Sequence, residues 1–169
     1  MNLYSTKYSS PLGTIVLESD GECLTSLRFV DEESREVLNP INSEVIPHIL
    51  AQARQWLDDY FAGKKPRIIP RLNPHGTDFQ KRVWQALFTI DYGQTKTYGE
   101  IAKMIDCCSA QAIGQALTRN LIAIIIPCHR VIAAHGKIGG YGFVVELKRQ
   151  LLQLESGWCA GDSRLLETN

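Results

Sequence analysis

The 169-residue chain has no excess of charge of either sign, no long apolar run and no paired-cysteine motif. Eighteen Lys and Arg residues balance eighteen Asp and Glu residues, which argues against a strongly basic protein that binds nucleic acid by charge alone. No apolar run approaches the roughly 20 residues that span a bilayer, so no membrane association is expected. The first ten residues lack the basic start and apolar stretch of a secretory signal, which favours a cytoplasmic location.

The five cysteines, at positions 23, 107, 108, 128 and 159, form neither a CxxC pair nor a zinc-finger spacing with histidine. In a reducing cytoplasm we therefore expect free thiols and no metal site. Apolar residues make up 44% of the chain and charged residues 21%, which is typical of a globular protein. At this length the chain can bury a core without disulfides.

The hydrophobic patterns predict an α+β (or α/β) fold in two parts. The first 30 residues hold runs rich in Ile, Val and Leu between Ser-Pro and Asp-Gly turns, which is typical of strands. An amphipathic helix follows over residues 46–61, and a stretch rich in proline and glycine follows that helix. We expect a strand-rich N-terminal domain over residues 1–72, a mostly helical C-terminal domain over residues 76–157, and a poorly ordered tail over residues 158–169.

The second part shows three helix starts. Thr77 with Gln80 and Thr97 with Glu100 have capping-box spacing, and Ser109 can cap a helix over residues 110–119. The last two helices are short and joined by about four residues, so their proportions suit a helix-turn-helix, although a plain helical hairpin fits equally well. Residues 122–126 predict a buried strand, and residues 145–155 predict a final helix. The segment 76–155 has a balance of +3 and is the better candidate for a surface that faces phosphates.

Cys128 is the candidate nucleophile. It follows an Ile run and Pro127, and it precedes His129, Arg130 and a glycine-rich loop. A cysteine attacks as a thiolate, which needs a nearby base or cation. Neighbouring side chains on an extended segment point in opposite directions, so a thiol–imidazole contact needs a tight turn or a bridging water. A carboxylate should orient the imidazole, and Glu155 and Glu100 are the candidates.

The segment IPCHRV resembles the active-site signature of the O6-alkylguanine-DNA alkyltransferases, also called methylated-DNA–protein-cysteine methyltransferases. TDFQKRVWQAL, TYGEIA, AIGQAL, GGYG and KRQLLQLE stand in the order of that family and near its spacings. KYSSPLGTIVLESDGECLTSLRF resembles the family's N-terminal, ribonuclease-H-like domain. The resemblance covers about residues 1–157.

This resemblance implies DNA repair by direct reversal of damage. An alkyl group moves irreversibly from O6-alkylguanine, and we expect also from O4-alkylthymine, in double-stranded DNA to the protein's own cysteine. Cys128 would accept the group, His129 would act as its base through a water, and Glu155 would orient His129. Tyr98 would donate a proton or hydrogen bond to the departing guanine. No metal, nucleotide or redox cofactor is implied, and we expect a single-turnover monomer.

The resemblance also implies a set of residues that bind DNA or the flipped base. The helix over residues 110–119 would lie in the minor groove, Asn120 would bridge this helix to the cysteine turn, and Tyr141 with the Gly142 N–H would form a lid. The full expected set is Gln111, Ala112, Gly114, Asn120, Arg119, Val131, Tyr141 and Gly142.

The chain departs from the family pattern at two places that bear on the base. The family usually has arginine where Gln111 stands, and its lid normally reads Tyr-x-Gly-Gly, whereas this chain has Tyr141-Gly142-Phe143-Val144. We expect Gln111 to intercalate weakly and Phe143 to narrow the pocket toward methyl groups.

Two further functions fit part of the pattern. A non-enzymatic protein that recognises alkylated DNA would share the fold but would not need Cys128. A transcription regulator would use the helix-turn-helix to read base edges through Gln111, Gln115, Thr118 and Arg119. A thiol hydrolase is disfavoured because it needs direct contact between Cys128 and His129.

Overall fold

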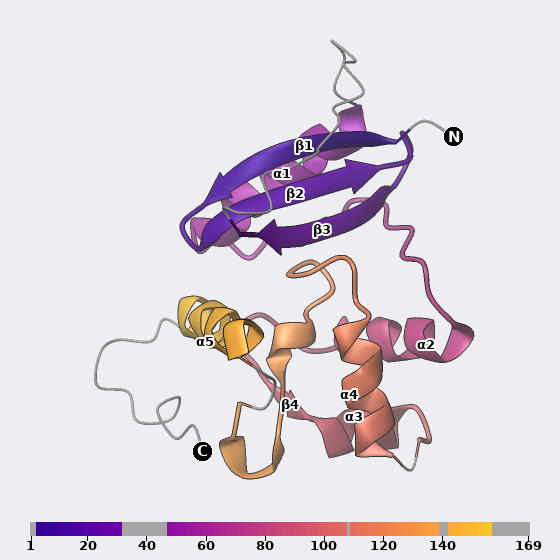
Figure 1. The fold of residues 1–169 in the computed structure, drawn as a ribbon. Coiled ribbons are helices and arrows are strands. Elements are labelled where there is room, and N and C mark those ends of the chain that lie inside the picture. Colours follow the sequence, from indigo (N-terminus) through magenta and orange to yellow (C-terminus); the bar gives the residue numbers. More distant parts are fainter. Residues whose placement is uncertain (1–2, 32–46, 108, 139–141, 157–169) are drawn as a thin grey trace. The chain divides into compact units, whose positions relative to one another are not determined.

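The computed structural model describes residues 3–31, 47–107, 109–138 and 142–156. Contacts divide the chain into two compact units (Figure 1). The first unit comprises Met1–His75 together with Leu121–Ile125, and the second comprises Gly76–Asn120 and Ile126–Asn169. The chain is mixed α+β, with antiparallel strands followed by helices, as the sequence predicted.

The first unit is a three-stranded antiparallel sheet with a helix packed against it (Figure 1). The strands are β1 (Tyr4–Ser10), β2 (Gly13–Ser19) and β3 (Leu24–Val30), in the order β1-β2-β3. Helix α1 (His48–Phe61) buries its apolar face, and the Tyr8 hydroxyl donates to Asp58 at 2.7 Å. The predicted strands and amphipathic helix are therefore confirmed.

The segment Leu121–Ile125 belongs to the first unit through bonds to β3. The Leu27 N–H donates to the Leu121 carbonyl at 2.8 Å, and the Ala123 N–H donates to the Leu27 carbonyl at 2.9 Å. The predicted strand over residues 122–126 is wrong, although four of its five side chains are buried. Ile124 has φ of 68°, and the Ile125 N–H donates to the Ala123 carbonyl at 2.8 Å, so the chain makes a tight three-residue turn.

The second unit holds four helices among its described residues: α2 (Asp78–Leu87), α3 (Tyr98–Met104), α4 (Ala110–Thr118) and α5 (Gly142–Ser156). Two short parallel strands, β4 (Lys96–Thr97) and β5 (Val131–Ile132), pair with each other. Between α4 and α5 lie two single-turn 3-10 helices, η2 (Cys128–Arg130) and η3 (Ala134–Gly136).

Three helices of this unit begin at the capping residues that the sequence predicted. Thr77 and Thr97 each form a complete capping box, and the Ser109 hydroxyl accepts from the Ala112 N–H at 3.1 Å. Helices α3 and α4 make the predicted helical pair, and the buried Trp84 of α2 donates to the Ala116 carbonyl at 2.9 Å. Helix α5 begins three residues before the predicted start, at Gly142. Among the described residues no helix is both long and apolar enough to cross a membrane.

Candidate active site around Cys128

Cys128 begins a single 3-10 turn that separates three consecutive side chains. Pro127 has φ of −82° and ψ of 63°, and this bend lets the Cys128 N–H donate to the Ile126 carbonyl at 2.8 Å. The Arg130 N–H then donates to the Pro127 carbonyl at 3.1 Å. Within the turn, Cys128 is half-buried, whereas His129 is buried. The segment is therefore not extended, and the adjacent side chains of Cys128 and His129 lie in different environments.

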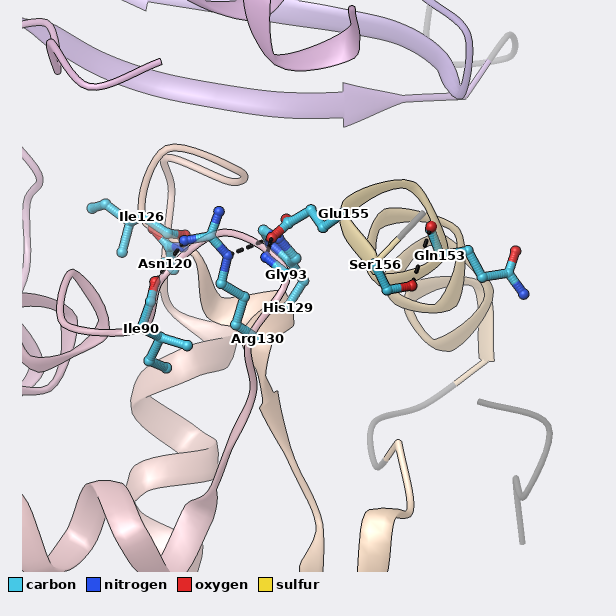
Figure 2. A network of polar contacts seen from close by, with 9 residues as sticks. All are labelled: Ile90, Gly93, Asn120, Ile126, His129, Arg130, Gln153, Glu155 and Ser156. Carbon is cyan, nitrogen blue, oxygen red and sulfur yellow. Dashed lines mark hydrogen bonds and ion pairs between the residues drawn. The ribbon is translucent and has the colours of Figure 1, made fainter. Parts of the chain in front are cut away.

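Glu155 is the carboxylate that meets His129 (Figure 2). Its Oε2 contacts His129 Nε2, while its Oε1 accepts from Arg130 Nε at 2.6 Å and from the Gly93 N–H at 3.2 Å. The alternative candidate, Glu100, instead caps α3. A carboxylate accepts hydrogen bonds only, so His129 Nε2 carries the proton and Nδ1 presents a lone pair.

His129 is held as a neutral base. Burial lowers its pKa below the ordinary value; the Glu155 carboxylate opposes this effect, and the charges of Arg130 and Lys148 reinforce it. Nδ1 is buried and has no hydrogen-bond partner among the described residues. The lone pair at Nδ1 is therefore the available proton acceptor of this imidazole.

Cys128 is held as a thiol rather than as a preformed thiolate. Burial raises its pKa, and the hydrogen bond from Asn120 together with the charge of Lys148 only partly offsets that effect. Asn120 follows α4, and its Nδ2 also donates to the Ile126 carbonyl at 3.0 Å. Asn120 thus links the end of α4 to the cysteine turn. A thiol in this state needs a base when it attacks.

Lys148 is a site residue that the sequence reasoning missed. It is buried on α5, and its Nζ lies 3.5 Å from the Tyr98 hydroxyl and 5.6 Å from the centre of the Tyr98 ring. Burial lowers its pKa to about 8, with the charge of Cys128 acting in the opposite direction. The signal was present in the periodicity, because Lys148 shares a helical face with Leu151, Leu152 and Glu155.

The residues expected to meet DNA occupy several environments. On α4, Gln111 is exposed and Ala112 and Gly114 are half-buried, and Arg119, the C-cap residue, is exposed. A Cβ on Gly114 would lie 3.8 Å from the Tyr98 ring, so α4 passes close to Tyr98. That distance is an ordinary van der Waals contact, so an alanine at position 114 would also fit beside the ring.

The remaining residues expected to bind DNA or the base are Val131, Tyr141 and Gly142. Val131 is buried on β5, and its N–H donates to the Cys128 carbonyl, which keeps a second lone pair for another donor. Tyr141 lies outside the described residues. Gly142 is the first residue of α5, and the side chain of Phe143 also lies outside the description.

This arrangement can transfer a proton from sulfur while the sulfur attacks an electrophilic carbon. The thiol and the imidazole belong to consecutive residues of one turn, and the imidazole contacts the Glu155 carboxylate. A tyrosine hydroxyl with a buried ammonium beside it can stabilise a departing anion. Within the described residues, no group of three or more His, Cys, Asp or Glu side chains could hold a metal ion.

Comparisons with known proteins agree with this chemistry. Residues 3–70 match the family described as "6-O-methylguanine DNA methyltransferase, ribonuclease-like domain", and residues 78–157 match "6-O-methylguanine DNA methyltransferase, DNA binding domain". The methylated-DNA–protein-cysteine methyltransferase of Mycobacterium leprae is 45% identical over 157 residues, which cover 90% of this chain and 92% of that protein.

Solved structures show the same relationship. The O6-methylguanine methyltransferase of Mycobacterium tuberculosis has a TM-score of 0.80 at 42% identity, covering 98% of this chain and 100% of that one. A structure of Mycobacterium tuberculosis OGT in complex with DNA has a TM-score of 0.79 at 42% identity, covering 97% and 99%. From both matched domains and from relatives aligned over nearly its whole length, the chain belongs to the 6-O-methylguanine DNA methyltransferase family.

Proposed function

We propose that this protein repairs double-stranded DNA by transferring a methyl or other alkyl group from O6-alkylguanine, and also from O4-alkylthymine, to the sulfur of Cys128. The observation that carries the proposal is the set of groups in and beside the Cys128 turn: a half-buried thiol, the imidazole of the next residue with its Nδ1 unpaired among the described residues, and a carboxylate fixed on Nε2. The first unit, close to residues 1–72, is the N-terminal domain of the proposal, and the second unit carries the acceptor.

The proton leaves sulfur as the carbon arrives. Because burial raises the pKa of Cys128 and lowers the pKa of His129, the resting pair is a neutral thiol beside a neutral imidazole. His129 Nδ1 takes the thiol proton through a water as the S–C bond forms and the C–O6 bond breaks. Glu155 then stabilises the imidazolium, because its Oε2 already contacts Nε2.

The departing guanine needs a proton, and Tyr98 is placed to give one. The Tyr98 hydroxyl lies 3.5 Å from the Lys148 ammonium, which stabilises negative charge on the phenol oxygen as the proton leaves. Exchange with solvent afterwards returns a proton to Tyr98 and removes one from His129. The thioether formed on Cys128 is a poor leaving group, so the protein acts once.

The base reaches Cys128 only after leaving the duplex, at a cost of a few kcal/mol. Helix α4, with Gln111 exposed near its start and Arg119 exposed at its end, is the element we assign to the minor groove. Ala112, Gly114 and Asn120 lie along or after this helix, and the carbonyls of Cys128 and Val131 would accept from the exocyclic amine of the base. Tyr141 and the Gly142 N–H would cover it, and the protein would act as a cytoplasmic monomer.

A titration with a duplex oligonucleotide that contains O6-methylguanine tests the proposal. We expect one equivalent of lesion to be consumed per protein, with one methyl group added to the Cys128 peptide in a mass spectrum. Cys128→Ser should abolish the transfer while still binding the duplex. Cys107→Ser is the matched control, because Cys107 is another half-buried free thiol of the second unit and should be dispensable.

Two outcomes would contradict the proposal. Binding of the lesion without any mass gain would identify a non-enzymatic recognition protein. Sequence-specific binding to undamaged duplex, without preference for the lesion, would identify a regulator.

A further inference from the structure

Arg130 connects three parts of the second unit through one guanidinium group (Figure 2). Its Nε donates to Glu155 Oε1 on α5 at 2.6 Å, and its NH1 donates to the Ile90 carbonyl, just after α2, at 2.7 Å. The same guanidinium lies 5.8 Å from the centre of the Tyr92 ring. Because the guanidinium is planar and rigid, two hydrogen bonds and a ring contact leave it little freedom.

This anchoring decides which oxygen of Glu155 is available to His129. Oε1 accepts from both Arg130 Nε and the Gly93 N–H, and this leaves Oε2 for His129 Nε2. A carboxylate held by one oxygen cannot rotate to offer the other. The position of Oε2 therefore follows from the position of Arg130.

We propose that Arg130 is a positioning residue for the transfer reaction, which fixes Glu155 so that His129 carries its proton on Nε2 and stays neutral with Nδ1 free to accept. This inference rests on the proposed function, because it assigns Arg130 a part in the base chemistry of the same site. Among the described residues, Arg130 contacts Glu155, the Ile90 carbonyl and the Tyr92 ring rather than the Cys128 sulfur. It acts through Glu155.

Two separable effects follow from the charge and the shape of this side chain. The charged groups that bear on His129 are Glu155 and Lys148 on α5 and Arg130 on its own turn. The preceding residue is Cys128, and the Tyr92 ring lies against Arg130 and is affected by the charge of Glu155. The positive charge of Arg130 opposes protonation of His129, whereas Glu155 favours it. The shape of the guanidinium fixes the carboxylate, and its charge adds to the effect of burial, which favours the neutral imidazole.

Arg130→Met and Arg130→Lys separate these effects. Methionine removes both charge and hydrogen bonds, so His129 should titrate at higher pH and its tautomers should mix. Lysine keeps the charge but cannot reproduce the rigid fork, so His129 should titrate nearly as in the wild type while its tautomers mix. Arg82→Met is the control, because Arg82 also donates to a backbone carbonyl, that of Ile105, but does not touch Glu155.

Nitrogen-15 NMR of the His129 ring reads tautomer and charge directly, without DNA and in the full-length chain. The wild type should show the Nε2-protonated tautomer. The rate of methyl transfer should fall about tenfold in Arg130→Met, a part of the roughly 10²–10⁴-fold that a positioned base contributes, and the fall should be larger at low pH. Circular dichroism identifies any variant that does not fold. If Arg130→Met does not fold, the ring spectra of folded Arg130→Lys decide whether the inference holds.

An unchanged tautomer and titration of His129 in a folded Arg130→Met or Arg130→Lys protein would overturn the inference and leave Arg130 with a purely structural role. Failure of the proposed function looks different. In that case the wild type would add no methyl group to Cys128, whatever the ring spectra show.

Discussion

The ammonium of Lys148 lies 3.5 Å from the hydroxyl oxygen of Tyr98, in a position where the lysine side chain is buried. Burying an ammonium costs several kcal/mol unless charges and hydrogen bonds compensate it. Among the described groups, the Lys148 ammonium donates to the Tyr98 oxygen and is favoured by the charge of Cys128 when the thiol is ionised. Both atoms gain negative charge during the proposed reaction, so the Lys148 ammonium stabilises the transition state more than it stabilises the resting protein.

Lys148→Met should stabilise the fold near neutral pH. The folded-state pKa of Lys148 is about 8, against 10.5 for the free side chain, so the unfolded chain binds more protons between these values and stability rises with pH across that window. Below pH 8 the buried charge costs about 3 kcal/mol, which methionine would recover in part. Urea unfolding near pH 7 measures this gain, and the gain should shrink as the pH rises from about 8 to 10.5. Lys81→Met, at an exposed site, should change stability little.

The rate of methyl transfer should depend on pH in two steps. It should rise as His129 loses its proton, at a pH below the ordinary histidine range because burial lowers the His129 pKa. It should fall above about pH 8 as Lys148 loses its proton. Single-turnover assays across this range test both limbs. In Lys148→Met the alkaline limb should disappear, and a limb that persists there would mean that another group titrates.

Tyr98→Phe should slow methyl transfer about 10²-fold or more, because the guanine then leaves without its proton donor. Alkylation of Cys128 by iodoacetamide provides the control, since iodide leaves without a proton. The variant should react with iodoacetamide as fast as the wild type. Equal slowing of both reactions would instead mean that Tyr98 supports the thiol.

Gly93→Ala should destabilise the second unit by about 1–3 kcal/mol. Gly93 has φ of 80°, and an added Cβ would lie 3.1 Å from the Glu155 carbonyl oxygen. Gly63→Ala is the matched control, because Gly63 has φ of 78° with open space around it. Thermal unfolding of both variants separates backbone strain from crowding at Glu155. Equal losses would show that crowding contributes nothing.

Gln111→Arg should tighten binding to duplex DNA and steepen its dependence on salt. Gln111 is exposed in the first turn of α4, and each added phosphate contact increases the salt slope by about one. Fluorescence anisotropy at several salt concentrations measures this change. An unchanged slope would place residue 111 away from the phosphates.

Local signals in the sequence predicted the helix starts, because a capping box depends only on residues three apart, as at Thr77 and Thr97. The strand expected at residues 122–126 failed because the bend at Ile124 is imposed by pairing with Leu27, far away in the chain. The residues alone offered both Glu155 and Glu100 as the carboxylate partner of His129, because only the folded helix α5 brings one of them to the imidazole. The family resemblance pointed to Glu155. The role of Arg130 likewise depends on three separated segments meeting.

The placement of Leu121–Ile125 in the first unit means that the second unit is not a continuous stretch of chain. A shortened protein beginning at residue 76 would retain these five residues but lose Leu27, whose backbone satisfies the Leu121 carbonyl and the Ala123 N–H. Cys128 follows this segment by only three residues. Truncation would therefore remove the hydrogen-bond partners of the segment that leads to the acceptor sulfur. Point substitutions in the full-length chain keep those hydrogen bonds.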